Sequence, residues 1–330
     1  MVKKEAILAG GSAGAVMMGI ERLKDRIPDG AVCVAILADR GERYLDTIFS
    51  DHWVHEHFGE VSHLWNAKEG GPNMRYGSIL VLNGSDVLSV LEGMEERIMG
   101  SVKWAYETHQ MGLSSLPHST FLRFPESDRN RIIALPAYLP GEHGGAGVKW
   151  VSSFPTNLNK GIERASAVVI LNSTLTGRPQ AMVEGSVINA KRTAASAALA
   201  AKHLHPDRNV AAVGIVGCGQ VGFEVQRFLK AAFPDIETSY IYDIDPARAE
   251  KFKAKSIKAF HDMEFIAVKD LTEMFELTSL LVLATTAVQP HISDFAGLRP
   301  GRTVLHVSLR DLTPELILRC DNVVDDIDHV

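Results

Sequence analysis

The sequence predicts an α/β protein with a doubly wound parallel sheet, and three observations carry this prediction. Between Asn209 and Asp243 the chain runs from a buried strand at 210–216 through a glycine-rich turn and an amphipathic helix at 223–229 to a second strand at 240–242. Strands and helices then continue to alternate towards residue 324. A separate block of strands between 120 and 186 predicts a second domain of α+β type before this unit.

The glycine-rich turn has the sequence GCGQVG and joins a predicted strand to a predicted helix. Gly217 permits the tight turn, Gly219 lets a diphosphate approach the backbone, and Gly222 lets helix and strand pack closely. The free N–H groups at the start of the helix favour bound phosphate, and Gln220 and Val221 in the turn before it are expected to contact the cofactor as well. In this context the spacing predicts a Rossmann-type dinucleotide site.

An acidic residue, Asp243, ends the second strand of this unit. A carboxylate there accepts the ribose hydroxyls of NAD and repels the 2′-phosphate of NADP. The sequence therefore predicts NAD as the cofactor. Arg248 follows closely and would tolerate the extra phosphate, so NADP stays open as an alternative.

Composition limits the remaining classes of protein. The chain has 330 residues with 46% hydrophobic and 22% charged residues and a net charge of −6, which predicts a globular protein that does not bind nucleic acid. Three widely spaced cysteines favour a cytoplasmic protein without disulfide bonds. No cysteine or histidine spacing predicts a metal site, and no apolar run reaches the length of a membrane span.

The pattern divides the chain into residues 1–60, a linker at 61–77, a substrate-binding domain at 78–205 and a nucleotide-binding domain at 206–330. Before the glycine turn, strands are expected at 32–37, 78–82, 120–124, 131–136, 148–152, 167–171 and 181–184, and helices up to residue 23, from an N-cap at Asp86 to 105, and at 186–203. After it, a helix is expected at 246–255 and strands at 265–268, 280–284, 303–307 and 322–324.

Ligands of such folds bind beyond the carboxyl ends of the parallel strands. Thr285, Thr286, Ser308 and Asp311 directly follow two of the predicted strands. We therefore expect all four residues on the rim that faces the cofactor.

Three cations, Arg123, Lys149 and Arg192, stand in apolar or small-residue surroundings of the substrate-binding domain. A buried lysine has a lowered pKa and can act as an acid or a base, while arginine binds carboxylates with two parallel hydrogen bonds. The alternative is that all three form structural ion pairs. The pattern alone leaves both interpretations open.

Several segments resemble the ornithine cyclodeaminase/mu-crystallin family, over roughly residues 78–330. They are RIIALPAYL, GVKWVSSFPTNLNKGIERASAVVILN, AMVEGSVINAKRTAASAALAAKHL and GIVGCGQVG. The resemblance implies an NAD-dependent, homodimeric enzyme with a small amino acid as substrate. By position, Arg123 and Arg192 would bind substrate carboxylates, Lys149 would be the active-site lysine and Asp311 the catalytic aspartate.

Within the family, ERASAVVILN and GEHGGAGVKW are most similar to the branch of 2,3-diaminopropionate biosynthesis. This implies oxidative cleavage of N-(2-amino-2-carboxyethyl)-L-glutamate to 2-oxoglutarate and L-2,3-diaminopropionate, for a siderophore or an antibiotic. Ile133 stands where ornithine cyclodeaminases have an acidic residue, which argues against ornithine. Ornithine cyclodeamination, ketimine reduction and a non-enzymatic, nucleotide-binding mu-crystallin remain alternatives.

The N-terminal segments ILAGGSAGAV and ILADRGERYLDT resemble the C-terminal part of cysteine synthase-like PLP enzymes, with Ala38 in place of their proline. The resemblance implies that Ser12, in the turn from Gly10 to Gly14, matches the serine that bonds the PLP ring nitrogen. The family's Schiff-base lysine and phosphate loop have no counterpart here, so we expect no PLP. We expect instead the remnant of a synthase fused to the next enzyme of the pathway, with both ends of the pair cut.

Overall fold

The computed structural model describes residues 11–28, 31, 35, 50–58, 79–141, 143–294, 296 and 300–326. It divides into two compact units, Met1–Tyr76 and Gly77–Val330. In the first unit, helix α2 (Gly11–Leu23) continues into the 3-10 turn η1 (Lys24–Arg26), and α3 spans Asp51–Phe58. The helix expected up to residue 23 is thus confirmed. The strand at 32–37 and the linker at 61–77 lie outside the described residues, and the PLP-enzyme remnant stays a prediction.

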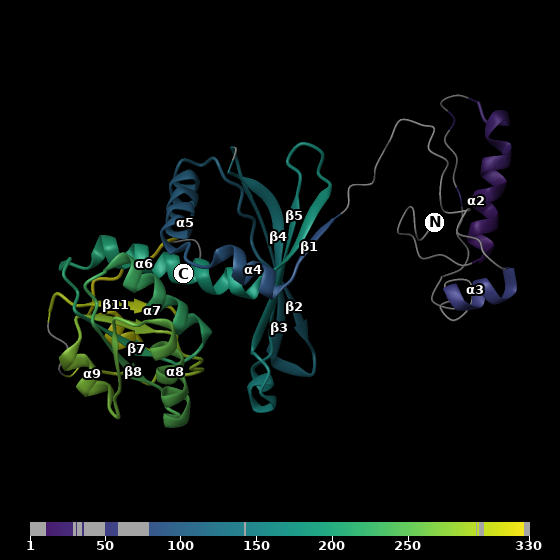
Figure 1. The fold of residues 1–330 in the computed structure, drawn as a ribbon. Helices are drawn as coiled ribbons and strands as arrows, with labels where there is room; N and C mark the ends of the chain where they lie inside the picture. Colours follow the sequence, from purple (N-terminus) through teal and green to yellow (C-terminus); the bar gives the residue numbers. More distant parts are fainter. Residues whose placement is uncertain are drawn as a thin grey trace. The chain divides into compact units, whose positions relative to one another are not determined.

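The second unit begins with a six-stranded sheet in the order β1-β6-β5-β4-β3-β2 (Figure 1). Its strands are β1 (Leu80–Leu82), β2 (Thr120–Phe124), β3 (Ser127–Leu139), β4 (Gly145–Ser153), β5 (Ala165–Asn172) and β6 (Pro179–Glu184). Strands β2 to β6 pair antiparallel, while β1 pairs parallel with β6. The six strands expected in this region are confirmed, with β3, β4 and β5 longer at both ends, β6 longer at its start and β1 beginning only at Leu80.

The two faces of this sheet have different surroundings, because side chains alternate along each strand. One face packs against α4 (Gly84–Leu91) and α6 (Ser186–Leu204) through Val87, Ala181 and Val183. The other face carries a cross-strand row that includes Val81 and Met182, which are 62% and 41% exposed. Helices therefore cover one face, and apolar side chains stay exposed on the other.

The single helix expected from Asp86 to 105 is wrong in two respects. The structure has two helices here, α4 and α5 (Glu95–Gln110), because the backbone becomes extended at Glu92 and then turns at Gly93, which has a φ of +68°. The N-cap is Asn83, whose side chain accepts from the amides of Ser85 and Asp86, while the Asp86 carboxylate caps the amide of Asn83 in return. Asp86 is therefore the third residue of a capping box.

Helix α6 connects the two sheets and packs against both α5 and α7 (Gln220–Ala232). Its buried face consists of alanines and one lysine, Lys191, so neighbouring helices approach closely. Lys191 Nζ lies 3.3 Å from Glu224 on α7 and 4.0 Å from Glu95 on α5. This buried charge network joins the three helices, because Lys191 on α6 faces one carboxylate from each of its neighbours.

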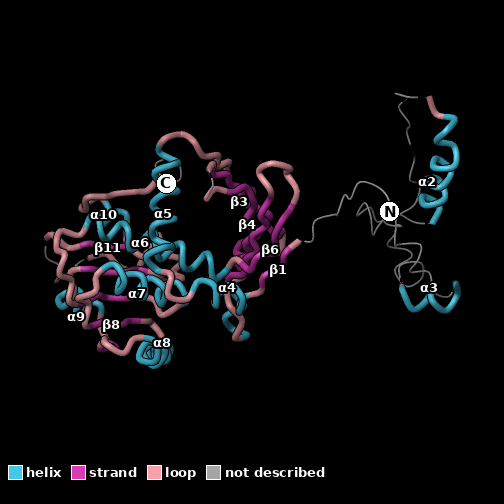
Figure 2. The backbone as a smooth tube through the Cα atoms, turned by 45° about the horizontal axis from the view of Figure 1, so that its top comes forward, coloured by secondary structure: helices cyan, strands magenta, loops and turns pink. Residues whose placement is uncertain are grey.

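The second sheet is wholly parallel, in the order β11-β10-β7-β8-β9. Its strands β11 and β8 are labelled in Figure 2. Its elements are β7 (Ala212–Val216), β8 (Thr238–Tyr242), α8 (Pro246–Ala259), β9 (Glu264–Ala267), α9 (Leu271–Leu277), β10 (Leu280–Leu283), β11 (Thr303–His306) and α10 (Pro314–Ile317). From β7 the chain first builds outwards to β9 and then returns to the other side of β7 at β10. Such a switch point opens a crevice at the carboxyl ends of the strands.

The α/β architecture is thus confirmed, whereas the strand expected at 322–324 is absent. The side-chain amide of Asn322 donates to the carbonyls of Ile317 and Cys320, so this segment follows the end of α10 as a loop. Helices α9 and α10 were not expected from the sequence. Within the described part of the chain, no helix has the length and hydropathy that a bilayer crossing requires.

Candidate functional site

The turn after β7 has the geometry of a dinucleotide-binding loop. Gly217 has a φ of +96°, and a Cβ there would lie 2.5 Å from the carbonyl oxygen of Ala284. A Cβ on Gly222 would lie 2.5 Å from the carbonyl oxygen of Gly217. A Cβ on Gly219 would meet no atom within 4 Å. Gly217 and Gly222 are therefore required by the protein itself, while the space beside Gly219 is open to a ligand.

The N-terminus of α7, next to this space, differs from those of its neighbours. Asp245 and Asp270 cap α8 and α9 by accepting backbone N–H groups. Gly219 is the N-cap of α7, and no side chain of the described residues caps that helix. The amides of its first turn, which begins at Gln220 and Val221, are therefore available to an anion.

Asp243 lies directly after β8 and fixes the shape of the turn. One carboxylate oxygen accepts the amide of Cys218 at 2.9 Å, and the other accepts the amide of Asp245 at 3.0 Å. Arg248 Nε lies 3.8 Å from the first oxygen. Burial, assisted by the charge of Asp243, raises the pKa of the Cys218 thiol to about 12, so this thiol stays protonated.

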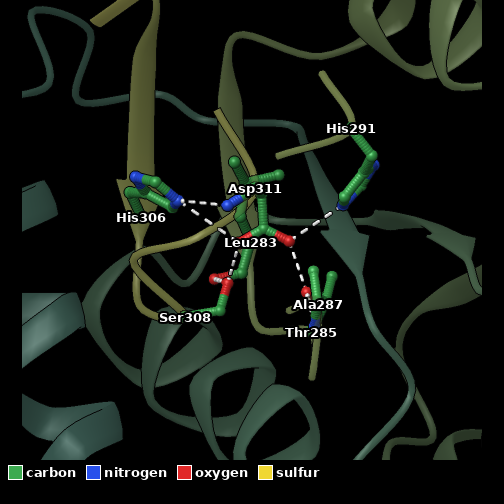
Figure 3. Close-up of polar contacts among 7 residues, drawn as sticks. All are labelled: Leu283, Thr285, Ala287, His291, His306, Ser308 and Asp311. Carbon is green, nitrogen blue, oxygen red and sulfur yellow. Dashed lines mark hydrogen bonds and ion pairs between the residues drawn. The ribbon is translucent and has the colours of Figure 1, made fainter. Parts of the chain in front are cut away.

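Asp311 is the centre of a polar cluster at the carboxyl ends of β10 and β11 (Figure 3). Its side chain is fully buried, and it accepts hydrogen bonds from the hydroxyls of Thr285 and Ser308. His291 Nε2 and His306 Nε2 lie 3.1 and 3.2 Å from its two carboxylate oxygens. Burial alone would raise the pKa of Asp311, but the hydrogen bonds from these four side chains outweigh it and lower the pKa.

This cluster changes the picture of the rim that the sequence predicts. Thr285 and Ser308 lie together as expected, but the hydroxyls of both are hydrogen-bonded to Asp311, and the Ser308 hydroxyl also lies 2.9 Å from the carbonyl oxygen of Leu283. Thr286 follows as an exposed residue. His291 and His306, which sequence reasoning missed, keep 39% and 18% of their side chains exposed. The histidines, and not the aspartate, present titratable groups at the surface.

A second polar group lies on the covered face of the antiparallel sheet. Lys149 Nζ donates to Asn189 Oδ1 at 2.8 Å, and Arg192 Nη2 donates to the same oxygen at 3.1 Å. Burial, together with the charge of Arg192, lowers the pKa of Lys149 to about 8. The structure thus brings two of the three cations of the sequence analysis, Lys149 and Arg192, to one asparagine that the sequence analysis did not single out.

Arg123 lies elsewhere on the same face. Lys149 pairs with Leu135, whereas Arg123 pairs with Arg131, four residues back along β3. The Arg123 guanidinium stacks on Phe121 at 5.3 Å from the ring centroid. Arg123 is therefore outside the hydrogen-bonded group of Lys149. No cluster of metal-binding side chains occurs among the residues that the structure describes.

Comparison with known proteins gives consistent matches. The model of the ornithine cyclodeaminase/mu-crystallin family matches residues 81–314. The chain is 31% identical to an N-((2S)-2-amino-2-carboxyethyl)-L-glutamate dehydrogenase of Staphylococcus aureus over 252 residues, which are 75% of this chain and 74% of that protein.

Two solved structures share its fold. A Δ1-pyrroline-2-carboxylate reductase of Thermococcus litoralis, in complex with NADH and L-proline, is 29% identical with a TM-score of 0.64, covering 72% of this chain and 73% of its own. An archaeal alanine dehydrogenase dimer with bound NAD is 27% identical with a TM-score of 0.59, covering 70% of this chain and 71% of its own.

Proposed function

The chain belongs to the ornithine cyclodeaminase/mu-crystallin family, and we propose that it is the NAD-dependent dehydrogenase that cleaves N-(2-amino-2-carboxyethyl)-L-glutamate. The coarser assignment, an NAD-dependent oxidoreductase acting on an amino acid, follows from the family and from its relatives. Two observations support the proposed substrate. Lys149 and Arg192 are paired through Asn189. The chain is also 31% identical to that dehydrogenase. The products would be 2-oxoglutarate and L-2,3-diaminopropionate, a precursor of siderophores or antibiotics.

The turn from Gly217 to Gly222 fits the cofactor. The open space beside Gly219 and the uncapped start of α7 would hold its diphosphate, and Asp243 would accept its ribose hydroxyls. When bound, NAD accepts the two electrons and the hydrogen that leave the Cα of the glutamate part. The domains that meet at this crevice would be residues 78–205 and 206–330.

Lys149 is the proton-transfer group in this proposal. With a pKa of about 8, a substantial fraction of its amine is neutral near physiological pH, and the neutral form removes the proton of the substrate's secondary amine. Loss of this proton, together with the hydride that NAD would accept, would leave an imine, to which water adds as hydroxyl on the carbon and hydrogen on the nitrogen. The proton held by Lys149 would then pass to the nitrogen as the C–N bond breaks, and the hydroxyl proton is released as the carbonyl forms. Asn189 keeps Nζ in place throughout.

The arginines and Asp311 have separate tasks. Arg192, beside Lys149, and Arg123 would each bind a carboxylate of the substrate through charge-assisted hydrogen bonds. Asp311 has no exposed surface, so we assign it a positioning role: it holds Thr285, Ser308 and the two histidines at the edge of the sheet. Thr285, Thr286 and Ser308 would line the cofactor site from there.

We propose that the exposed face of the antiparallel sheet binds a second copy of this chain. Its row of apolar side chains includes Val81, Met182 and Trp150, all at least 41% exposed, on strands whose other face packs on helices. Exposed apolar surface on a regular sheet marks an interaction site, and twofold pairing is the commonest solution. The similar archaeal alanine dehydrogenase is a dimer. Sedimentation of wild type and of Val81→Lys would test this.

The decisive assay is NADH formation from N-(2-amino-2-carboxyethyl)-L-glutamate, with 2-oxoglutarate and diaminopropionate identified as products. Formation of proline and ammonia from ornithine would favour an ornithine cyclodeaminase instead. NADH consumption with cyclic ketimines would favour a reductase. Tight NAD binding without turnover of any of these compounds would favour a mu-crystallin-like binding protein.

A further inference from the structure

A group of arginines lies at one end of the antiparallel sheet. Arg123 on β2 and Arg131 on β3 are directly opposite each other in the ladder. Like charges in this arrangement destabilise a sheet unless something neutralises them. The Nε atom of Arg131 is also buried without a hydrogen-bond partner. A buried donor left unpaired costs free energy, so this group is arranged for a partner that the protein itself does not provide.

Two further arginines extend this group. Arg131 pairs with Ser153, and Ser153 pairs with Ala165, the first residue of β5, so Arg164 directly precedes β5 at the same end of the sheet. Arg310, in the loop after β11, comes from the parallel sheet. Burial, together with the positive charges of Arg131 and Arg310, lowers the pKa of Arg164. Across the described residues, none of these four arginines has an acidic partner within ion-pair distance.

The loop that carries Arg310 is held in a strained conformation. Leu309 is the one described residue other than glycine with a positive φ, at 64°, and its side chain is 76% exposed. Such a conformation persists only where the surroundings enforce it, and it is common at functional sites. Here Ser308 and Asp311, on either side, are bonded to each other and to the end of β10. The Asp311 cluster therefore fixes the position of Arg310.

We propose that Arg123, Arg131, Arg164 and Arg310 form an oxyanion site between the two domains, and that a carboxylate of the substrate remote from the reacting carbon–nitrogen bond occupies it. This inference rests on the proposed function, and it adds Arg131, Arg164 and Arg310 to the residues that would select the substrate.

The register explains why a remote carboxylate fits. Lys149 lies opposite Leu135 on β3, and Arg123 lies opposite Arg131 on the same strand. Leu135 and Arg131 are four residues apart along β3. At ~3.3 Å per residue the two cationic groups are about 13 Å apart along the sheet, before side chains reach towards each other. N-(2-amino-2-carboxyethyl)-L-glutamate has carboxylates at both ends. Alanine has only one carboxylate and could not occupy both cationic groups. Ornithine has an ammonium group at its far end, which the arginines would repel.

The diphosphate of the cofactor is the other oxyanion that enters this crevice. Its loop follows β7, whereas Arg310 follows β11, and β10 lies between these strands. Arg310 is therefore on the side of the switch point away from the diphosphate loop, which favours the carboxylate. The two sources are separable with probes that need no turnover: glutarate for the carboxylate and ADP-ribose for the diphosphate.

The test compares Arg131→Gln and Arg310→Gln with Arg129→Gln, an exposed arginine next to the same strand end. Calorimetry on the full chain should show glutarate binding roughly tenfold or more weaker in both variants, since a hydrogen bond to a charged group contributes that much. ADP-ribose binding and the Arg129→Gln control should stay unchanged. Without ligand, the midpoint of thermal unfolding should rise or stay constant in both variants, because like charges repel less. If either arginine instead stabilised the fold, its replacement would lower the midpoint of thermal unfolding.

If the variants lost ADP-ribose binding but kept glutarate binding, the arginines would bind the diphosphate of the cofactor, and the proposed carboxylate occupant would be wrong. Unchanged binding of both probes in both variants would overturn the site. Because Arg310 is on an exposed loop, its variant should fold even if Arg131→Gln does not. Neither probe requires catalysis, so a chain that binds glutarate through these arginines but forms no NADH would contradict the proposed reaction and not this site.

Discussion

Lys149 Nζ donates a hydrogen bond of 2.8 Å to the side-chain oxygen of Asn189, which joins the antiparallel sheet to the second turn of α6. An amide oxygen satisfies an amine whether or not that amine is charged. A carboxylate at the same place would stabilise the ammonium form and raise the pKa. The choice of asparagine therefore lets burial and Arg192 keep the pKa of Lys149 at about 8.

The first prediction concerns the pH dependence of this lysine. Because the neutral amine removes the proton, kcat/KM should rise with pH and level off above about pH 8. Lys149→Met should lower kcat by about 10²–10⁴-fold, the usual effect of losing one acid or base. Lys103→Met, on the exposed side of α5, is the matched control. A flat profile between pH 6.5 and 9.5 would remove the lysine from the chemistry.

Replacing Arg192 tests how far its positive charge lowers the pKa of Lys149. Its positive charge contributes to the lowered pKa of Lys149, so Arg192→Gln should move the inflection of kcat/KM to higher pH. The same change should raise KM more than it lowers kcat, because the bond to a substrate carboxylate exists in the ground state and the transition state alike. An unshifted inflection with normal KM would show that Arg192 only packs against the helix.

The second prediction separates the glycines of the cofactor turn. Gly217→Ala should destabilise the fold, since its Cβ would lie 2.5 Å from the oxygen of Ala284 and its φ is positive. Gly219→Ala should fold normally, because its Cβ meets no protein atom within 4 Å, but should weaken NAD binding by filling the space of the diphosphate. Thermal unfolding and NAD titration of both variants measure this. Equal NAD affinity in Gly219→Ala would place the cofactor elsewhere.

The third prediction concerns the choice between NAD and NADP. Asp243→Asn keeps an oxygen that accepts the Cys218 amide but removes the charge that repels a 2′-phosphate. NAD should bind wild type more tightly than NADP, and the variant should narrow this difference while Arg248 remains to bind the phosphate. Calorimetry with both nucleotides gives the ratio. Tighter binding of NADP to wild type would contradict the expectation drawn from Asp243.

Sequence patterns predicted those features that a short stretch of chain specifies by itself. The spacing of the GCGQVG turn, the small residues of α6 and the apolar runs of β7 and β10 each depend on neighbours in sequence. Boundaries were less secure: Asn83 and Asp86 are both plausible caps, and only their reciprocal hydrogen bonds identify Asn83 as the first.

The candidate site shows the same limit. Asn189 acquires its role from β4, and His291 and His306 acquire theirs from Asp311. The facing of Arg123 and Arg131 depends on the ladder register of β2 and β3, which the sequence does not state. These groupings arise from chain crossings and strand pairing, so no local signal indicated them.

The last prediction concerns Asp311. Asp311→Asn would leave the donors of Thr285, Ser308 and the histidines around a neutral amide that accepts with only one oxygen. Breaking such a buried charged group costs about 3 kcal/mol of unfolding free energy. Asp321→Asn, at an exposed position, should cost nothing measurable.

The pH dependence of stability distinguishes this role from plain packing. The folded pKa of Asp311 is lowered below its unfolded value of about 3.9, so its carboxylate contributes fully above about pH 4. As pH falls further, the unfolded chain takes up the proton first and the contribution shrinks. The difference in unfolding free energy between wild type and Asp311→Asn should therefore decrease as the pH falls from 5 towards 2. Urea titrations across this range measure it, and a difference that does not change with pH would show that the charge of Asp311 stabilises nothing.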